Sequence, residues 1–587
     1  IDPLFVTTAD EIDIVTNLFT GLTRTDPQTG EVIGALAESW SFDDDSLAWT
    51  FVLRDDVAWV RYDAVSDEIL PVRTVTAQDV LFTFQRLCSS VDNGYYATEV
   101  FASLLAGCVE SQNSGDVSVL EASAPDEVTF TIRLTGQYGY FLSMSRLWTI
   151  YPVPQDVVNN QNWTQPGTML SSGAYVLTED TDDRLVLRRN SLYPADLWQG
   201  GNLAQIEIQI VADVFEQTAL YAQDLIDWTA IPPGDVEAAR DNPEYRDITQ
   251  QSVFYIGFVA DKAPFDDVYV RRAFAAMFDR AMFMENVVSA TGSPIAHFTP
   301  PGLEHAPPQQ ADFDVGYDPA YANQQLAQST YPGCLGMPPI TARTFQGGAD
   351  WVTFLAQQIR EIPGCETLTF DIEEVDSVDA LQTLLTPQTA PESRPHLFTL
   401  GWAADYNDAD SFATFLMCGA NNPTARNCSE LDEVIVQARQ EIDSTVRESL
   451  YMQIEAGFFG AEGEFPLIPI STGISHLLVK PWLQIDDGMV MDTAGQRYDA
   501  YVLMPDLLPG SRISCEIGTE VGANLRFSPT TDAGIGARLF RGDIRGAIGQ
   551  VTGSDGFIWW QLESGLWVRA DVVITSNYCL LLPTVTP

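Results

Sequence analysis

Eight cysteines restrict the fold of this 587-residue chain more than any other feature, because none of them lies in a CxxC pair. Without metal-ligand spacing, neither a zinc ribbon nor a thioredoxin-type redox pair is expected. An even number of such cysteines is typical of disulfides formed in an oxidising compartment, with eight free thiols in a cytosolic protein as the alternative. Pairing each cysteine with its nearest neighbour predicts four bridges: Cys88–Cys108, Cys334–Cys365, Cys418–Cys428 and Cys515–Cys579.

The charge balance excludes several classes of partner. The chain carries 30 Lys and Arg residues against 81 Asp and Glu residues, a formal net charge of −51. Such a field repels both the phosphate backbone of nucleic acid and an anionic membrane surface, so neither is expected as a partner. We interpret the acidity as a source of solubility in an extracellular setting, with a weak bias towards cationic or zwitterionic ligands.

Helix-like and strand-like segments are mixed along most of the chain. Alternating apolar residues indicate strands near 47–53 and 130–134, whereas the apolar residues of 12–19 have helical spacing. Residues 430–459 indicate two successive helices, separated near Asp443. The elements show no strict βαβ repeat, so we expect an α/β fold of irregular topology.

The pattern changes after Pro509-Gly510. Residues 511–580 contain short β-like runs and many glycines without a convincing helix, and they indicate a separate small β domain closed by Cys515 and Cys579. Residues 582–587 are rich in proline and threonine and resemble the start of a linker. No apolar run of the sequence is long enough to span a bilayer, and no signal peptide is recognisable.

Motifs for catalysis and metal binding are missing from the sequence. The four histidines, His297, His305, His396 and His476, form neither an HExxH motif nor another metal-ligand spacing. There is no GxSxG elbow and no P-loop, and among 81 acidic residues no single carboxylate pair is informative. We therefore expect neither an enzyme nor a bound metal or cofactor.

The order of several motifs resembles that of the extracellular solute-binding proteins of family 5, the peptide- and nickel-binding receptors of ABC importers. The stretch Gly401–Phe412, GWAADYNDADSF, is the most specific match, and Pro264–Phe274 matches a second pattern of the family closely. Val259 replaces a polar strand residue of the family, and a longer hairpin at 62–70 replaces a usual loop, which bears on the ligand class more than on the fold. The other matching segments, within residues 1–505, are Asn17–Leu22, Ala35–Trp40, Trp49–Val57, Val75–Phe84, Ser171–Leu177, Arg188–Tyr193 and Phe465–Ile470.

This resemblance implies a two-lobed body like that of periplasmic binding proteins, of the type II, large cluster C kind, followed by a small all-β barrel. The last domain is similar to bacterial SH3-like modules in three segments, Ala523–Arg526, Gly536–Gly542 and Gly565–Val568, and in a pair of tryptophans. The expected boundaries are 1–40, 171–253 and 481–508 for a discontinuous lobe I, 41–170 for its accessory subdomain, 254–480 for lobe II, 509–580 for the SH3-like domain and 581–587 for the tail.

The resemblance also implies a ligand site between the lobes. Asp405 aligns with the aspartate that pairs with the α-ammonium group of the ligand in peptide-binding relatives; a helix cap or a pair with a nearby arginine is the alternative. Trp402, Tyr406 and Phe412 are expected to line side-chain pockets unless they belong to the core. Thr8 and Asp10 are expected to meet the ligand backbone, unless their N-terminal loop is a plain turn. Ser172 lies near a crossover between the lobes and is expected to contribute its backbone at most.

We therefore expect an extracellular receptor that captures oligopeptides or related amine-bearing solutes by lobe closure and passes them to an ABC permease in the membrane. The expected location is the cell surface, with a lipid anchor upstream of residue 1, or the periplasm. Trp559 and Trp560 are expected to offer a groove for cell-wall peptides, although one of two adjacent strand residues must face inwards. The alternative function is that of a structural, self-assembling or wall-anchored surface protein that reuses this scaffold.

Overall fold

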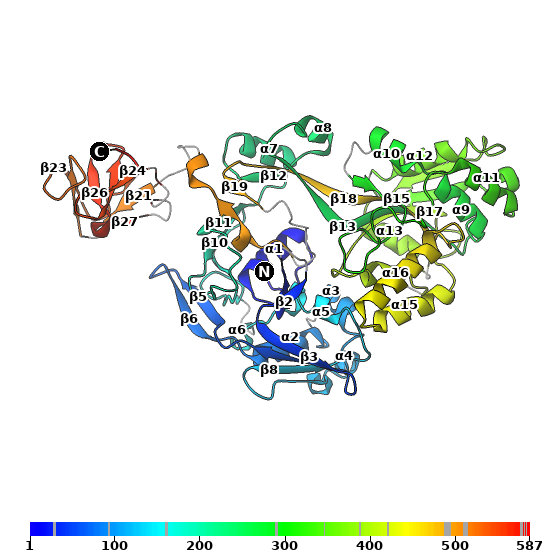
Figure 1. Ribbon diagram of the computed structural model, residues 1–587, viewed down its shortest axis with the longest axis horizontal. Coiled ribbons are helices and arrows are strands. Elements are labelled where there is room, and N and C mark those ends of the chain that lie inside the picture. The colour runs from blue at the N-terminus through cyan, green and yellow to red at the C-terminus, as the bar shows by residue number, and fades with distance from the viewer. Residues whose placement is uncertain are drawn as a thin grey trace.

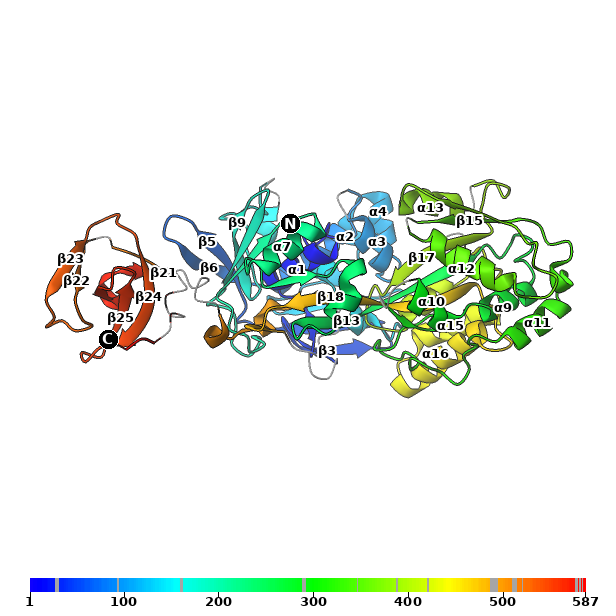
Figure 2. The same ribbon diagram turned by 90° about the horizontal axis from the view of Figure 1, so that it is seen from above.

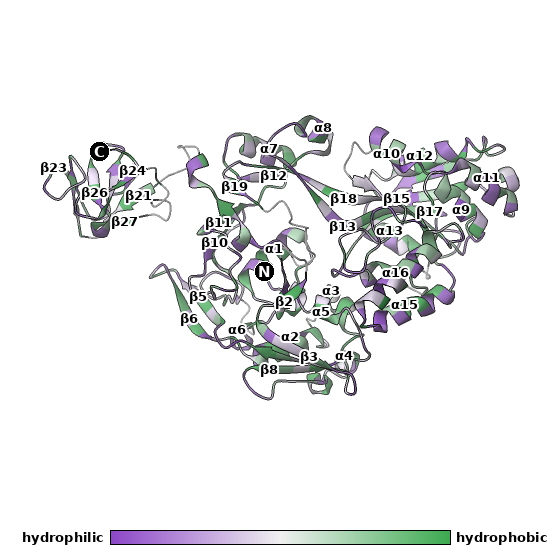
Figure 3. Cartoon of the chain, viewed as in Figure 1, coloured by the Kyte–Doolittle hydropathy of each residue, from purple (hydrophilic) through white to green (hydrophobic). Residues whose placement is uncertain are grey.

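The computed structural model divides the chain into two large lobes and a small C-terminal domain, arranged along its longest axis (Figures 1 and 2). Each of these parts has its own hydrophobic core. Strongly hydrophilic segments lie on outer helices of lobe II, such as α11 (Pro319–Gln328) and α15 (Glu430–Gln440) (Figure 3). The structure describes residues 1–26, 31–91, 94–158, 162–287, 292–345, 347–386, 389–419, 422–485, 495–508, 515–519, 521–575, 579, 582 and 584–586.

Lobe I is built around α1 (Ala9–Leu18) and an antiparallel sheet of strand order β11-β10-β9. Thr8 caps α1, because its hydroxyl accepts a hydrogen bond from the backbone N–H of Glu11 at 3.4 Å. Val15 and Leu18 are fully buried on the inner face of this helix. The other elements on the lobe I side are β1 (Thr23–Thr25), β2 (Val32–Gly34), β9 (Tyr175–Asp180), β10 (Arg184–Arg189), β11 (Gln205–Gln209), α7 (Val214–Ala222), α8 (Val236–Ala239), β19 (Leu483–Gln484) and β20 (Val502–Leu503).

An accessory subdomain of lobe I contains an antiparallel sheet of order β3-β4-β8-β7. The hairpin expected at 62–70 is confirmed, since Tyr62 of β5 pairs with Ile69 of β6. The elements of this subdomain are β3 (Ala37–Asp43), β4 (Ala48–Leu53), β5 (Ala58–Asp63), β6 (Glu68–Thr74), α2 (Ala77–Leu87), α3 (Tyr95–Phe101), α4 (Cys108–Ser114), β7 (Ala122–Ser123), β8 (Thr129–Arg133), α5 (Phe141–Met144) and α6 (Gln155–Val158).

Lobe II is organised around a mixed sheet of order β12-β18-β13-β17-β15-β16, in which β15 pairs in parallel with β16 and β17. The expected break between two helices near Asp443 is confirmed, because Asp443 caps the second of them by accepting from the N–H of Val446 at 3.0 Å. The further elements are α9 (Val268–Ala276), α10 (Arg280–Asn286), β14 (Gly292–Pro294), β15 (Ile340–Thr344), α12 (Ala349–Ile359), β16 (Phe370–Glu374), α13 (Val378–Leu385), β17 (Leu397–Ala403), α14 (Asp410–Leu416) and α16 (Ser444–Phe459).

Two long strands connect the lobes. β13 (Tyr245–Phe258) and β18 (Leu467–Val479) pair antiparallel along most of their length and run from the lobe I side into the sheet of lobe II (Figure 1). At the lobe I end, β12 (Trp228–Ala230) adds to β18. A ribbon of this kind can bend as a hinge, so we call β13 and β18 the hinge strands.

The C-terminal domain is a small β domain of strand order β23-β22-β26-β25-β24-β21-β27. Trp559 and Trp560 are 1% and 2% exposed, so the expected groove on these tryptophans is not open in this structure. Trp559 is covered because its indole N–H donates to Asp555 at 3.1 Å, while Trp560 faces the core. The likeness to SH3-like modules stays a prediction. The strands are β21 (Cys515–Gly518), β22 (Ala523–Arg526), β23 (Ile535–Leu539), β24 (Arg545–Thr552), β25 (Ile558–Leu562), β26 (Trp567–Arg569) and β27 (Ile574–Thr575).

The four disulfides expected from nearest-neighbour pairing are all present, and none of the cysteines in the structure is free. The alternative of eight free thiols is thereby excluded for this fold. Within the described ranges of the chain, no helix combines the length and the apolar character that a membrane span requires.

Candidate ligand-binding site

A cavity of about 500 Å³ lies where both lobes meet the hinge strands. This volume is within the range of about 300–1,000 Å³ that is typical of small-ligand sites. One wall comes from β12 and α8 on the lobe I side, another from the N-terminal end of α12 in lobe II, and the hinge strands lie between them. The lining residues are Ala230, Ile231, Val236, Gln250, Phe254, Val287, Gly347, Asp350, Trp351, Gly473, Ile474, Ser475, His476 and Leu477.

β17 has an open edge beside this cavity. The strand pairs with β13 along its whole length, but β15 accompanies it only as far as Thr399. Ala404 donates its N–H to Gln251 of β13 at 2.8 Å, so by alternation Gly401 and Ala403 direct their backbone groups away from β13. Both residues are exposed, and no strand of the described chain pairs with them on that side. The edge can therefore accept an extended peptide as an additional strand.

Two residues join the open edge to the cavity. Gly347, in the turn that follows β15, is part of the cavity wall. Phe254 also lines the cavity, and its ring would lie only 2.9 Å from a Cβ atom at position 401, so glycine lets this ring pack against β17. Phe254 is in turn held edge-on by Trp351, with ring centroids 5.8 Å apart. A ligand on the edge at Gly401 thus has a side-chain pocket next to it.

Asp405 follows directly after β17 and is half-buried. Its N–H donates to the hydroxyl of Ser411 at 2.9 Å. The cap position of α14 is occupied by Ala409, so Asp405 does not cap that helix. Trp402 is also half-buried; its indole N–H donates to the carbonyl of Ser411 at 3.1 Å, and its ring packs against Phe415. This packing fixes the end of β17, which Asp405 directly follows.

Tyr406 lies in a second contact between the lobes, which joins lobe II to the accessory subdomain. Its ring stacks on Tyr140 of the accessory subdomain with centroids 5.1 Å apart, and it is 6% exposed. Arg439 of α15 donates to the Tyr140 hydroxyl, and the N–H of Gly139 donates to the Arg439 carbonyl at 3.2 Å. We call these four residues the interlobe bridge. With its ring covered in this way, Tyr406 offers no pocket surface to a ligand in this arrangement of the lobes, in contrast to its expected role.

Buried charges support the interlobe bridge from lobe II. Arg447 of α16 donates to both carboxylate oxygens of Asp408, at 2.7 and 2.8 Å, and both side chains are nearly inaccessible. Burial by itself would raise the pKa of Asp408, but the hydrogen bond from His305 and the charge of Arg447 outweigh it and lower the pKa. For Asp410, which accepts from the Tyr406 hydroxyl at 2.7 Å, burial dominates and raises the pKa.

Glu304, His305 and Asp408 form a group that could be mistaken for a metal centre, since possible ligand atoms of the three lie within 4.8 Å of one another. Their carboxylates already have partners, however. Asp408 is paired with Arg447, and Glu304 accepts from the hydroxyl of Ser143 in the accessory subdomain at 3.0 Å. We interpret this group as part of the contact between the lobes.

The remaining expected site residues are placed in different surroundings. Thr8 and Asp10 are exposed at the N-terminal end of α1, where Thr8 acts as the cap; their role towards a ligand stays a prediction. Ser172 is buried and its hydroxyl accepts from the N–H of Thr20 at 3.0 Å. Phe412 is fully buried, edge-on to Phe298 in the core of lobe II. Neither Ser172 nor Phe412 reaches a surface that a ligand could touch, because both side chains are needed for internal packing.

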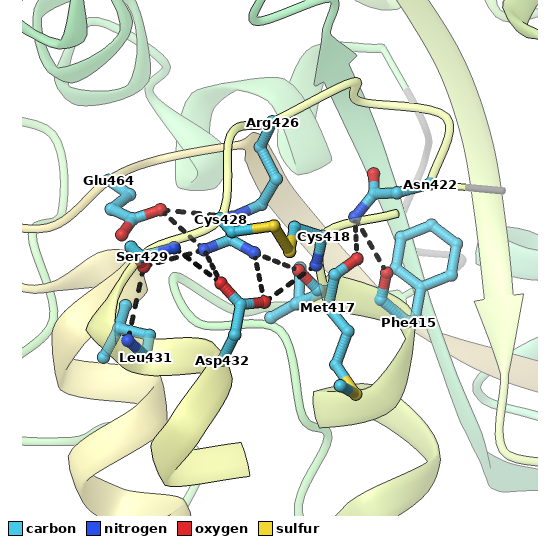
Figure 4. Close-up of a disulfide and its surroundings, with 11 residues drawn as sticks. Phe415, Met417, Cys418, Asn422, Arg426, Cys428, Ser429, Leu431, Asp432 and Glu464 are labelled. Atoms are coloured by element: carbon cyan, nitrogen blue, oxygen red, sulfur yellow. Dashed lines mark hydrogen bonds and ion pairs between the residues drawn. A yellow bond between two sulfur atoms is a disulfide. The ribbon is translucent and has the colours of Figure 1, made fainter. Parts of the chain in front are cut away.

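A second cavity, of about 370 Å³, lies beside the Cys418–Cys428 disulfide in lobe II. Figure 4 shows the Arg426 side chain passing next to this disulfide; its guanidinium donates to both carboxylate oxygens of Asp432 at 2.7 and 3.0 Å and pairs with Glu464. Burial would raise the pKa of Asp432, but the hydrogen bond from Arg426 reverses the direction and lowers it. The arrangement ties the loop after α14 to the start of α15, and we interpret it as structural.

Sequence reasoning missed the residues that line the cavity. Most of them come from β12, α8, the hinge strands and α12, and none of them belongs to a motif recognised in the sequence. No motif in the sequence marks these residues, and the length of the hinge strands, 14 residues in β13 and 13 in β18, is seen only in the structure.

Comparisons with known proteins agree with this architecture. The profile of the bacterial extracellular solute-binding proteins, family 5 (middle part), matches residues 31–424. The periplasmic murein peptide-binding protein MppA of Escherichia coli strain K12 is 25% identical over 500 residues, which cover 82% of this chain and 87% of MppA. The probable deoxycholate-binding periplasmic protein YgiS of the same strain is 27% identical over 508 residues, which cover 82% of this chain and 88% of YgiS.

Solved structures show the same fold. The unliganded open form of MppA superposes with a TM-score of 0.72 at 22% identity, covering 86% of this chain and 94% of that one. The complex of Haemophilus influenzae OppA with RPPGFSPFR gives a TM-score of 0.63 at 21% identity, covering 86% and 96%.

The family profile covers more than half of the chain, and the solved structures have the two-lobed architecture described above. The family consists of binding proteins and not of enzymes, and the comparisons favour a receptor over a structural surface protein. The chain therefore belongs to the bacterial extracellular solute-binding proteins of family 5.

Proposed function

We propose that this protein is a receptor that captures short peptides by their free amino terminus and presents them to an ABC permease. The observation that carries the proposal is the juxtaposition of three features: the open edge of β17 at Gly401–Ala403, the carboxylate of Asp405 just beyond it, and the cavity at Phe254. A peptide needs partners for its backbone, its terminal ammonium group and its side chains, and these features supply one of each.

The order of these features sets the direction of the ligand. A peptide whose ammonium group meets Asp405 starts at the C-terminal end of β17 and runs antiparallel past Ala403 and Gly401. Alternate side chains of an extended peptide point to the same face. A side chain near the second or third position therefore comes to the mouth of the cavity beside Phe254.

Lobe closure follows from the origin of the cavity walls. Residues of the lobe I side and of lobe II line the same space. A ligand that contacts both walls binds the closed arrangement better than the open one, so its binding shifts the population towards closure. A permease can then distinguish a loaded receptor from an empty one.

The family alone does not choose the ligand. The names of the relatives include a murein peptide-binding protein and a probable deoxycholate-binding protein. The choice of a peptide rests on the hydrogen-bonding edge, because a steroid has no backbone groups to pair with Gly401 and Ala403.

Calorimetric titration with alanine tripeptides tests the proposal. We expect the free tripeptide to bind and its N-acetylated form to bind far more weakly, and we expect Asp405→Asn to weaken the free tripeptide by about 2–5 kcal/mol. Asp379→Asn, an exposed acid of α13 in the same lobe, is the matched control and should leave affinity unchanged. Equal binding of the free and acetylated forms would refute the amine anchor, and no binding by a broad peptide library would refute the peptide receptor.

A further inference from the structure

We propose that the cavity beside Phe254 is a side-chain subsite that selects cationic side chains, lysine or arginine, and rejects acidic ones. This inference rests on the proposed function, because it treats the cavity as the place where one side chain of a bound peptide lies. It adds the substrate class: peptides with a basic residue near the second or third position.

The charge of the cavity wall is the first argument. Asp350 is the only lining residue with a formal charge at neutral pH when histidine is counted as neutral, and no lysine or arginine lines the cavity in the described part of the chain. Asp350 lies in the first turn of α12 and is exposed, and among the described residues its side chain forms no ion pair or hydrogen bond. Its carboxylate is thus available to a ligand.

Two charged side chains beside the α12 wall of the cavity do not oppose this preference. Glu374, at the end of β16, accepts the N–H of Gly347 at 2.8 Å and adds a second carboxylate at the rim. Arg343 of β15 is occupied by Glu373 at 2.9 Å. A carboxylate brought into the cavity would lose water close to Asp350 without gaining a cation, which is unfavourable.

The apolar part of the wall suits a long cationic side chain. Ile231 and Val236 lie on one side of the cavity and Trp351 on the other. Lysine and arginine place their methylene stems along such apolar surfaces while the charged end reaches a carboxylate or water. The indole of Trp351 also attracts a cation that lies over its face. A basic side chain therefore gains both from packing and from charge.

Asp350 has one other physical role, since a carboxylate in the first turn of a helix interacts favourably with the helix dipole. The control variant Asp379→Asn removes the same charge at the corresponding position of α13, which is not part of the cavity. A change found in Asp350→Asn but not in Asp379→Asn is then due to the position of the carboxylate in the cavity.

The test is calorimetric titration of the full chain with four-residue alanine peptides that carry lysine, leucine or glutamate at the second or third position. For the wild type we expect lysine to bind about five- to tenfold more tightly than glutamate at one of the two positions, with a preference that shrinks as salt is added. In Asp350→Asn this preference should fall to about twofold or less while the leucine peptide keeps its affinity, which also shows that the variant is folded.

The outcomes separate the two proposals. If lysine and glutamate peptides bind equally well to the wild type, the cationic subsite is refuted and the peptide receptor stands. If the preference survives in Asp350→Asn, or is lost equally in Asp379→Asn, the cavity is not its source and the inference is wrong. If no peptide of the set binds at any position, the proposed function itself fails.

Discussion

Asp13 makes the stability of lobe I depend on pH in an unusual direction. This residue lies on α1, is 8% exposed, and accepts the backbone N–H of Gln496 at 2.7 Å. Burial raises its pKa from 3.8 to about 7; the hydrogen bond from Gln496 opposes the shift, and the charge of Asp10 adds to it. At moderately acidic pH the folded protein thus keeps a proton that the unfolded chain has lost.

The expected magnitude follows from linkage. Because the pKa of Asp13 is higher in the folded protein than in the unfolded chain, the unfolded chain binds fewer protons between about pH 4 and pH 7. The free energy of unfolding is therefore highest, as far as Asp13 is concerned, below about pH 4 and falls as the pH rises to about 7. A difference of about three pKa units corresponds to about 4 kcal/mol in the free energy of unfolding. Above pH 7 the penalty for the buried charge is constant.

Asp13→Asn removes the titrating group and keeps a side-chain oxygen that can accept from Gln496. We expect the variant to resemble the wild type near pH 4 and to be more stable by up to about 4 kcal/mol at pH 8. Scanning calorimetry at half-unit pH steps would follow the transition that contains lobe I. Asp10→Asn, an exposed change on the same helix, is the control and should move the transition far less, because the charge of Asp10 is the smallest of the three causes named for the Asp13 shift. Parallel curves for Asp13→Asn and the wild type between pH 4 and 8 would refute the reasoning.

Two further changes probe other parts of the structure. Arg447→Met leaves the buried Asp408 without its arginine partner, with only His305 beside it, and should destabilise lobe II by about 3–5 kcal/mol in urea denaturation. Adding Asp408→Asn should restore most of the loss. An Arg447→Met variant as stable as the wild type would contradict the buried pair. Replacing Cys515 and Cys579 together by serine opens a loop with a sequence separation of 64 and should destabilise the C-terminal domain by about 4 kcal/mol. Scanning calorimetry should show a lower transition temperature for that domain alone. An unchanged transition temperature would show that the disulfide does not stabilise the domain.

Features with local causes were predictable from the sequence. The break between α15 and α16 is set by Asp443, whose side chain caps the second helix within one turn. The disulfides join cysteines that are nearest neighbours among the cysteines of the chain, so counting along the sequence was enough. The motif Gly401–Phe412 consists of consecutive residues, so the resemblance to the family could be recognised without knowledge of the fold.

The tryptophans of the C-terminal domain show where a local rule fails. Alternation along β25 predicts that either Trp559 or Trp560 faces away from the core. Trp560 faces the core as the rule allows, but the turn containing Gly553 and Asp555 folds over the other face and covers Trp559. The alternation of side chains predicts which face of a strand a residue lies on, but it does not predict whether a turn from elsewhere covers the face that points away from the core.

The surroundings of Asp405 depend on a contact that no local pattern contains. Tyr406, its neighbour in sequence, is held against Tyr140 by stacking and linked to Arg439 through the Tyr140 hydroxyl, and these partners come from the accessory subdomain and from α15. The backbone at Asp405 can shift only as far as this interlobe bridge permits, while the hinge strands fix the opposite side of the cleft. When the hinge strands bend, Asp405 moves with lobe II relative to lobe I. The stacking of Tyr406 on Tyr140 restricts this movement for as long as the interlobe bridge is intact. The motif predicts which residue meets the ligand, but the position of that residue also depends on the accessory subdomain, on α15 and on the hinge strands.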